Sequence, residues 1–299
     1  FKEYGKLSHM PIDDLEKGAR IDVSEKKEDA LDFALWKAAK PGEPYWESPW
    51  GKGRPGWHIE CSAMVLRYLG ESIDIHCGGQ DLIFPHHENE IAQSECCTGK
   101  PFAKYWLHNG YINVNNTKMS KSLGNFFTVR DVAEKYGYPV IRFFILSAQY
   151  RSPINFSAEI IEQSKSALER LWNCLENIGF YLEKAPDGPQ TAEAKAQTDA
   201  LREKFVSEMD DDLNTAGGVG AIFELVRQAN ELIGAGASRA DVEYVGNTLT
   251  ELCELMGLMP EKNSAGDEFI HEIEDAIERR SAAKKAKNYA EADKIRAEL

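Results

Sequence analysis

The chain has 299 residues, of which 42% are hydrophobic and 28% are charged, and its formal net charge is −14. No apolar run reaches the roughly 18 residues that a membrane-spanning helix needs, and the acidic balance counts against a general nucleic-acid coat protein. The six cysteines are scattered without the framework of a small disulfide-bonded domain, so we expect a cytoplasmic protein with reduced thiols.

The first 125 residues predict a parallel α/β sheet. Up to residue 60 tryptophans alternate with Gly and Pro, which indicates loops, and residues 61–70 are then typical of a helix. Strands are predicted at 72–77 and 104–114, the second followed by a turn at 115–117. Between them Pro85 is favoured as the first residue of a helix over 86–97. This alternation of helices and strands indicates parallel pairing.

After residue 157 the pattern becomes helical. Residues 158–184 and 213–236 carry apolar side chains at helical spacing, and residues 184–198 are predicted to be the loop that joins two such helices. Three successive aspartates at 210–212 indicate a helix start, where negative charge favours the macrodipole. A highly charged helical pair is predicted to follow a break at residues 259–268.

Histidines are concentrated in the α/β part. Six of the seven histidines come before residue 109, and five of the six tryptophans share that region. Imidazole is the commonest metal ligand and a general acid or base near neutral pH. The sequence therefore places the chemistry in the first 125 residues.

One candidate metal site combines three residue types. His86 and Glu90 are four residues apart, so they share one face of a helix, and Cys61 comes from an earlier element. Thiolate, imidazole and carboxylate together suit zinc. The spacing alone equally allows a surface hydrogen-bonded pair and a small core cysteine.

Two further segments are candidates for ligand binding. GGQD at 78–81 lies at the predicted end of a strand, where α/β proteins bind ligands, although a turn with a capping aspartate has the same pattern. KMSKSLGN at 118–125 places Lys118 and Lys121 on a small polar loop, which by itself is also typical of a solvated turn.

Taken together, these segments resemble the class I aminoacyl-tRNA synthetases, and among them the cysteinyl-tRNA synthetase family. The resemblance is carried by RPGWHIECSAM (54–64), DIHCGGQDLIFPHHENEIAQSE (74–95) and KMSKSLGNFFTVRDV (118–132). Residues 137–157 are similar to the start of the family's helical bundle, and MDDDLNTA (209–216) to a segment within it.

The resemblance implies a fold and its division. We expect an α/β class, with a partial Rossmann-type parallel sheet followed by an all-α bundle. Its implied parts are the C-terminal half of the catalytic domain with the zinc site at 1–112, a KMSKS-loop and stem-contact region at 113–157, an anticodon-binding bundle of the DALR kind at 158–259, and the start of a small anticodon-recognition module at 268–299.

The implied activity is that of an enzyme, an ATP-dependent ligase. The family forms cysteinyl-adenylate from cysteine and ATP with Mg²⁺, and then transfers the cysteinyl group to tRNA(Cys). Zinc distinguishes cysteine from near-isosteric serine because it binds a thiolate directly. We expect a monomer.

The resemblance also assigns roles to single residues of this sequence. They comprise zinc ligands (Cys61, His86 and Glu90), a tryptophan that closes the amino-acid pocket (Trp57), a ribose-binding turn (Gly78, Gly79 and Asp81) and two catalytic lysines (Lys121, which also binds ATP, and its companion Lys118).

Two alternatives stay open at this point. A cysteine ligase of mycothiol synthesis has the same active site, and a non-catalytic tRNA-binding fragment would keep the same motifs. The family's HIGH-type motif and a fourth zinc ligand, another cysteine, are not among these residues. We therefore expect that the 299 residues do not catalyse adenylate formation alone.

Overall fold

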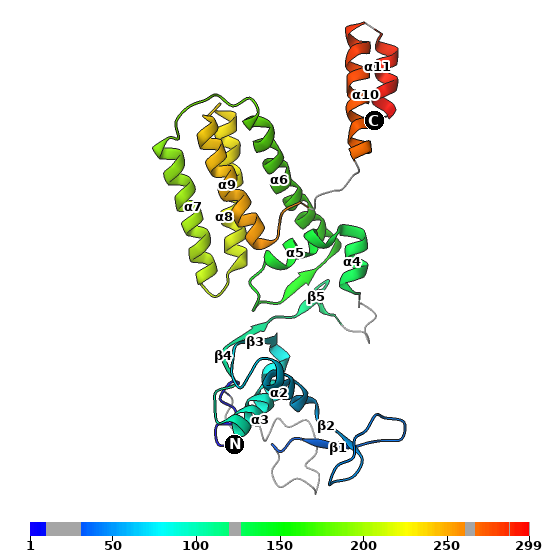
Figure 1. The fold of residues 1–299 in the computed structure, drawn as a ribbon, viewed down its shortest axis with the longest axis vertical. Coiled ribbons are helices and arrows are strands. Elements are labelled where there is room, and N and C mark those ends of the chain that lie inside the picture. The colour runs from blue at the N-terminus through cyan, green and yellow to red at the C-terminus, as the bar shows by residue number, and fades with distance from the viewer. Residues whose placement is uncertain (10–30, 120–126, 261–266, 287, 299) are drawn as a thin grey trace. The chain divides into compact units, whose positions relative to one another are not determined.

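The computed structural model describes residues 1–9, 31–119, 127–260, 267–286 and 288–298. The chain divides into two compact units, Phe1–Gly257 and Leu258–Leu299, which are described separately (Figure 1). The first unit contains an α/β part with a parallel strand pair and then a set of long helices, so the predicted fold class is confirmed.

A short antiparallel hairpin precedes the first long helix. β1 (Trp36–Ala38) pairs with β2 (Gly53–Pro55), and loops occupy most of the other described residues up to Gly56, as the sequence predicted. The helix α2 (Trp57–Tyr68) begins at Trp57 rather than at the predicted Cys61. The Gly- and Trp-rich segment thus contributes the first turn of a helix as well as loops.

Two parallel strands, β3 (Ile73–Gly79) and β4 (Ala103–Asn109), form the centre of the α/β part. Successive side chains of a strand point to opposite faces. Ile75 is accordingly exposed on one face, while His76 contacts α3 (Glu88–Thr98) on the other. The parallel register confirms the pairing that the alternation of helices and strands predicted.

The helix predicted from Pro85 begins later in the structure. Residues 83–87 form a wider helical turn in which Phe84 has extended backbone angles (φ −134°, ψ 132°) and a cis peptide bond joins it to Pro85. Regular helix begins only at Glu88, because the extended residue interrupts the ladder of helical hydrogen bonds. Gly99, with φ of 69°, ends α3 in the left-handed conformation.

A buried carboxylate at the start of α3 holds the N-terminal segment. Glu88 accepts backbone N–H groups of Gly5, Leu7 and Ser8 at 2.7 to 3.0 Å. Three donors to one charged acceptor compensate the cost of burying it. Residues 1–9 are therefore tied to the helix that also carries Glu90.

A second, three-stranded sheet follows the parallel pair. β5 (Ile112–Val114) pairs antiparallel with β6 (Thr117–Lys118) and parallel with β7 (Ile154–Phe156). Asn115 and Asn116, both with positive φ, make the turn predicted at this point, because asparagine tolerates that conformation better than most residues. Between β6 and β7 lie two short helices, α4 (Val129–Tyr136) and α5 (Tyr138–Leu146).

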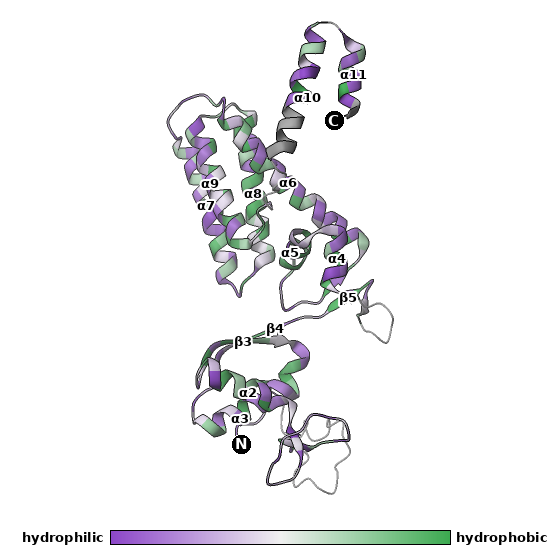
Figure 2. Cartoon of the chain, turned by 45° about the vertical axis from the view of Figure 1, so that its right-hand side comes forward, coloured by the Kyte–Doolittle hydropathy of each residue, from purple (hydrophilic) through white to green (hydrophobic). Residues whose placement is uncertain are grey.

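Four long helices complete the first unit as a bundle (Figure 1): α6 (Ala158–Leu182), α7 (Ala192–Asp210), α8 (Thr215–Gly234) and α9 (Arg239–Met256). Each begins at a residue whose side chain accepts a backbone N–H of the first turn: Ser157, Thr191, Asn214 and Ser238. Hydrophobic and hydrophilic residues alternate along these helices (Figure 2), and the buried apolar side chains form the bundle core.

The predicted loop at 184–198 is only half right. Residues 186–190 are irregular, but α7 begins at Ala192 and runs to Asp210. Its buried positions are Ala194, Thr198 and Phe205, so most of its contact stripe is small or polar. The segment consequently has too few large apolar residues at helical spacing to predict a helix from its pattern.

The aspartate run at 210–212 also differs from its prediction. Asp210 is the last residue of α7, and Asp212 has φ of 57° in the turn before α8. The carboxylates therefore do not stabilise a helix N-terminus. Asp212 instead bonds to residues outside the bundle helices, as described below.

The described residues of the second unit form two helices, α10 (Asp267–Lys285) and α11 (Tyr289–Glu298). Leu258, Ala276, Ala292 and Ile295 are its buried apolar side chains among those described. Neither these helices nor any other in the described part of the chain combines the length and apolarity that a membrane crossing requires.

Candidate functional site

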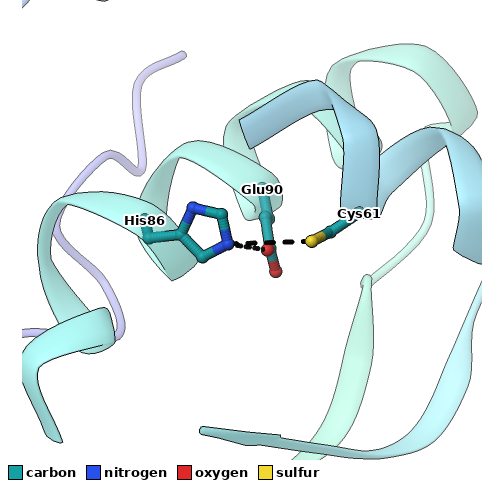
Figure 3. A group of neighbouring side chains, drawn as sticks. All are labelled: Cys61, His86 and Glu90. Atoms are coloured by element: carbon teal, nitrogen blue, oxygen red, sulfur yellow. Dashed lines mark hydrogen bonds and ion pairs between the residues drawn. The ribbon is translucent and has the colours of Figure 1, made fainter. Parts of the chain in front are cut away.

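Cys61, His86 and Glu90 meet at one point of the α/β part, although they come from three elements (Figure 3). Cys61 lies on α2, His86 on the turn at 83–87, and Glu90 on α3. The Cys61 Sγ atom is 3.7 Å from His86 Nε2, which is 2.6 Å from Glu90 Oε1. The three ligand atoms thus converge as a metal site requires.

The Glu90 carboxylate shows why a cation fits here. Its side chain is only 1% exposed, and its Oε2 atom accepts a hydrogen bond from His76 Nε2 at 2.6 Å. Among the described residues, none makes a hydrogen bond of acceptable geometry to its Oε1 atom, despite the short distance to His86. Burying a charged oxygen without a partner is costly, and a cation beside sulfur and nitrogen donors would compensate it.

The protonation states of the thiol and the carboxylate differ. Burial, reinforced by the negative charge of Glu90, raises the pKa of the Cys61 thiol to about 11. Burial also acts to raise the pKa of Glu90, but the hydrogen bond from His76 and the surrounding histidines outweigh it and lower that pKa. Glu90 is thus ionised at neutral pH, whereas Cys61 must lose a proton to bind a metal.

Further histidines surround the three ligands. His58 Nδ1 lies 2.8 Å from His86 Nδ1, and His87 Nδ1 lies 2.9 Å from His108 Nε2. Burial lowers the pKa of His58 and His108, and lowers that of His87 to about 4, so these rings are neutral at pH 7. They therefore orient their neighbours through hydrogen bonds rather than through charge.

A second group of possible ligands shares Glu90. Atoms of His76, His87 and Glu90 also lie within 4.8 Å of one another. In this group His76 already hydrogen-bonds Glu90 Oε2, whereas the cysteine-containing group contacts the carboxylate oxygen that lacks a partner. The group of Cys61, His86 and Glu90 is therefore the better candidate for a metal site, and His76 contacts Glu90 from the other side.

Sequence reasoning did not single out His58 or His76. The signal was present, because both belong to the histidines concentrated before residue 109. Their roles depend on contacts with residues 28 and 14 positions away, respectively, which no local spacing reveals.

Trp57 covers one side of the metal-ligand group. It is the first residue of α2 and 56% exposed, and its ring stacks on that of His86 with centroids 4.2 Å apart. The residue expected to close the amino-acid pocket is thus in contact with an expected zinc ligand.

The predicted ribose turn follows β3 directly. A Cβ on Gly78 would lie 2.7 Å from the buried His87 ring, which leaves no room for a side chain, whereas one on Gly79 would meet only the exposed Asp81 carboxylate, at 2.5 Å. Asp81 is exposed in the short helical turn Gln80–Leu82. Glycines and carboxylate thus lie at the C-terminal end of a parallel strand, where such sheets bind ligands.

The predicted lysine loop is described only at its start. Lys118 ends β6, with its backbone opposite Asn113. Lys121 lies outside the described residues, as do residues 120 and 122–126. The two lysines therefore remain a prediction of the sequence.

Comparisons with known proteins identify the class that this fold and site define. The model of the "tRNA synthetases class I (C) catalytic domain" matches residues 1–166, and the "DALR domain" model matches residues 204–260. The chain therefore belongs to the class I tRNA synthetase (C) family. A LeuRS of Agrobacterium radiobacter K84, solved in a ternary complex with tRNA and LeuAMS, shares the fold with a TM-score of 0.57 over 75% of this chain and 32% of that one, at 18% identity.

Two curated relatives carry the same name, cysteine–tRNA ligase. The chain is 55% identical to a cysteine–tRNA ligase of Caldicellulosiruptor saccharolyticus over 100% of its own length, and 54% identical to a cysteine–tRNA ligase of Brevibacillus brevis over 99% of it. In both cases it spans 64% of the length of the relative.

Proposed function

We propose that the chain forms the cysteine-selecting and tRNA-contacting part of a cysteine–tRNA ligase. The proposed reaction activates cysteine with ATP as cysteinyl-adenylate and then transfers it to tRNA(Cys). The observation that carries this proposal is the convergence of Cys61 with buried His86 and Glu90, where one Glu90 oxygen lies 2.6 Å from His86 Nε2 and makes no hydrogen bond among the described residues. Its support comes from relatives at 54 to 55% identity that are cysteine–tRNA ligases.

The proposed cofactor is zinc, held by Cys61, His86 and Glu90. When bound, zinc would supply a ligand position that a thiolate fills and an alcohol fills poorly. Other residues of the chain orient these ligands. His76 hydrogen-bonds the Oε2 atom of Glu90. The Nδ1 atom of His86 contacts His58, and the His86 ring stacks on Trp57. Selection of cysteine over serine would then rest on bond chemistry rather than on size.

The proposed nucleotide site comprises the turn Gly78–Asp81 and the two lysines of the KMSKS segment. Exposed Asp81 is available to accept ribose hydroxyl hydrogen bonds, and the glycines allow the backbone to approach a ligand closely. Lys118 and Lys121 are proposed to stabilise the negative charge that grows on pyrophosphate as it leaves. Mg²⁺ would accompany ATP as the phosphate counter-ion.

The helices after residue 157 are proposed to contact tRNA. The match of residues 204–260 to the DALR domain model supports this role for the bundle, and α10 and α11 are proposed as the start of an anticodon-recognition module. We further propose a cytoplasmic, monomeric enzyme.

The test uses the full-length protein, its Cys61→Ser variant and two assays. We expect about one zinc per chain, and ATP–pyrophosphate exchange that depends on cysteine and not on serine. Cys61→Ser should lose both the zinc and the discrimination, because an alcohol replaces the thiolate ligand. Retention of zinc by this variant would remove Cys61 from the ligand set.

The acceptor of the activated cysteine distinguishes the alternative functions. Charging of tRNA(Cys) with cysteine would confirm the ligase. Cysteine activation with transfer to an amino-sugar rather than to tRNA would identify the mycothiol-type enzyme. Binding of tRNA without any pyrophosphate exchange would identify a non-catalytic RNA-binding protein.

A further inference from the structure

The loop at 148–153, between α5 and β7, contacts the proposed nucleotide turn. The Arg151 backbone carbonyl accepts a hydrogen bond from the Gln80 side-chain amide at 2.8 Å. Gln80 is the residue between Gly79 and Asp81, so this bond holds the middle of the turn. The Tyr150 carbonyl likewise accepts the Gly110 N–H at 2.8 Å, at the junction of β4 and β5.

Close packing at the junction of β4 and β5 restricts movement of the 148–153 loop toward the sheet. A Cβ on Gly110 would lie 2.5 Å from both the carbonyl carbon and the oxygen of Ser152. The loop therefore packs directly on the end of β4, and a shift of the loop is transmitted to the Gln80 contact.

The opposite side of the same loop contacts the start of α8 and the turn before it: the Thr215 hydroxyl donates to the Ala148 carbonyl at 3.4 Å, and Asp212 makes the other bonds. Its Oδ1 atom accepts a hydrogen bond from the Tyr150 hydroxyl at 2.9 Å, and its Oδ2 atom is 2.7 Å from Arg151 Nε. Its backbone carbonyl accepts a bond from the Gln149 amide at 3.4 Å. Three successive loop residues thus converge on one residue of the α7–α8 turn.

Dense packing does not hold Gln80 in place. A cavity of about 350 Å³ lies beside it, lined by Gln80, Ile83, Trp106, His108 and Arg151. Gln80 and Asp81 are also exposed, and the preceding glycines restrain the backbone weakly. The hydrogen bond to Arg151 is therefore a main determinant of the turn's conformation.

We infer that Asp212 is a positioning residue for the nucleotide turn: by holding the 148–153 loop it fixes the Arg151 carbonyl that orients Gln80 between Gly79 and Asp81. The inference rests on the proposed function for the identity of the ligand, ATP. The physical link itself, from Asp212 through Arg151 to Gln80, is independent of which ligand the turn binds.

The first test measures amide hydrogen exchange in the full-length protein and its Asp212→Asn variant. Asparagine tolerates the positive φ of this position, so the substitution removes the charge with little backbone strain. We expect exchange over residues 78–83 to accelerate about threefold to tenfold. Asp211→Asn removes the same charge one residue away and should leave that exchange unchanged. Unchanged exchange in Asp212→Asn would overturn the inference.

A second variant guards against loss of the bundle fold. If exchange over α7 and α8 also rises in Asp212→Asn, Tyr150→Phe decides, since it removes only the hydroxyl that bonds Asp212. We expect a smaller acceleration over residues 78–83 and none in the bundle. Absence of any change at the turn in this variant would likewise overturn the inference.

Kinetics test the positioning role on the proposed reaction. Asp212→Asn should raise KM for ATP about threefold to tenfold and leave KM for cysteine unchanged. Adding Gln80→Ala to this variant should raise KM for ATP little further, because both substitutions break the same chain of contacts. Additive effects, or an equal rise in both KM values, would contradict the link. If the unmodified protein shows no pyrophosphate exchange, the proposed function fails, while hydrogen exchange still tests the link.

Discussion

At the residue scale, the two buried acidic side chains at the start of α3 differ in their hydrogen bonds and therefore in their roles. Glu88 is fully buried and its carboxylate accepts three backbone N–H groups, so its charge is compensated within the chain. Glu90, two positions later, is equally buried but keeps one oxygen without such a partner among the described residues. Glu88 therefore anchors the N-terminal segment, while Glu90 remains available to a cation.

His76 is expected to determine zinc affinity without binding zinc itself. Its hydrogen bond to Glu90 Oε2 holds the other carboxylate oxygen toward Cys61 and His86. His76→Phe keeps a ring but removes this donor, and should weaken zinc binding about 10- to 100-fold, measured by competition with a chelator. His108→Phe is the matched control, because His108 bonds His87 rather than Glu90. Equal affinities of the two variants would refute the orienting role.

Zinc affinity should also rise with pH. The pKa of the Cys61 thiol is about 11, so near neutral pH binding must displace its proton, and each pH unit upward lowers that cost. Because one proton is released, we expect zinc affinity to rise about tenfold per pH unit between about pH 7 and 8.5. The neighbouring His58, His87 and His108 do not titrate in this range, because burial lowers their pKa values. Cys61→Asp, already ionised there, should bind with a flatter pH dependence. If zinc affinity of Cys61→Asp rose as steeply with pH as that of the unmodified protein, the released proton would come from another group.

At the element scale, α7 shows how a helix with few large apolar residues is held in a bundle. Thr198 and Gln228, on α7 and α8, are both buried, and the Gln228 amide donates to the Thr198 hydroxyl at 3.0 Å and to the Ala194 carbonyl at 3.1 Å. A paired polar contact thus replaces part of the leucine packing seen elsewhere in the core.

This polar contact gives a stability prediction for the bundle. Thr198→Val keeps the shape but leaves the Gln228 amide short of a partner, which should lower the free energy of unfolding by about 1 to 3 kcal/mol. Urea denaturation of the full-length protein would measure the loss. Thr198→Ser retains the hydroxyl and should lose less, so a larger loss in the serine variant would show that the methyl group matters more than the hydrogen bond.

At the scale of the whole molecule, buried thiols link stability to alkaline pH. Burial raises the pKa of Cys174 to about 11 and that of Cys253 to about 12, whereas an unfolded cysteine ionises near pH 8.5. Above about pH 9 the unfolded chain therefore holds fewer protons than the native one, and the free energy of unfolding falls as pH rises.

The slope of this dependence is the measurable quantity. Each thiol that ionises only on unfolding contributes about 1.4 kcal/mol per pH unit once pH exceeds its unfolded pKa. Urea denaturation at several values between about pH 8 and 10.5 should show the decline, and Cys253→Ala should make it shallower by about one thiol's share. An identical slope in the variant would show that Cys253 ionises in the native state as readily as in the unfolded one.

The local pattern of the sequence determined much of this protein. The strands and the helix between Ile73 and Asn109, their parallel pairing and the closeness of His86 to Glu90 follow from spacing within single elements and from turn residues. Such features depend on neighbours within a few positions, and a chain encodes these directly. Spacing left the position of Cys61 beside His86 and Glu90 open.

The tertiary structure alone decided the rest. Only the folded chain leaves one Glu90 oxygen without a hydrogen bond among the described residues, makes α7 a helix around Thr198, and brings Asp212 to a loop 62 positions away. Each depends on which polar groups find partners after burial, and such partners lie far apart in sequence. Hydrogen-bond satisfaction in the folded state, rather than local propensity, is the physical reason that the sequence could not show them.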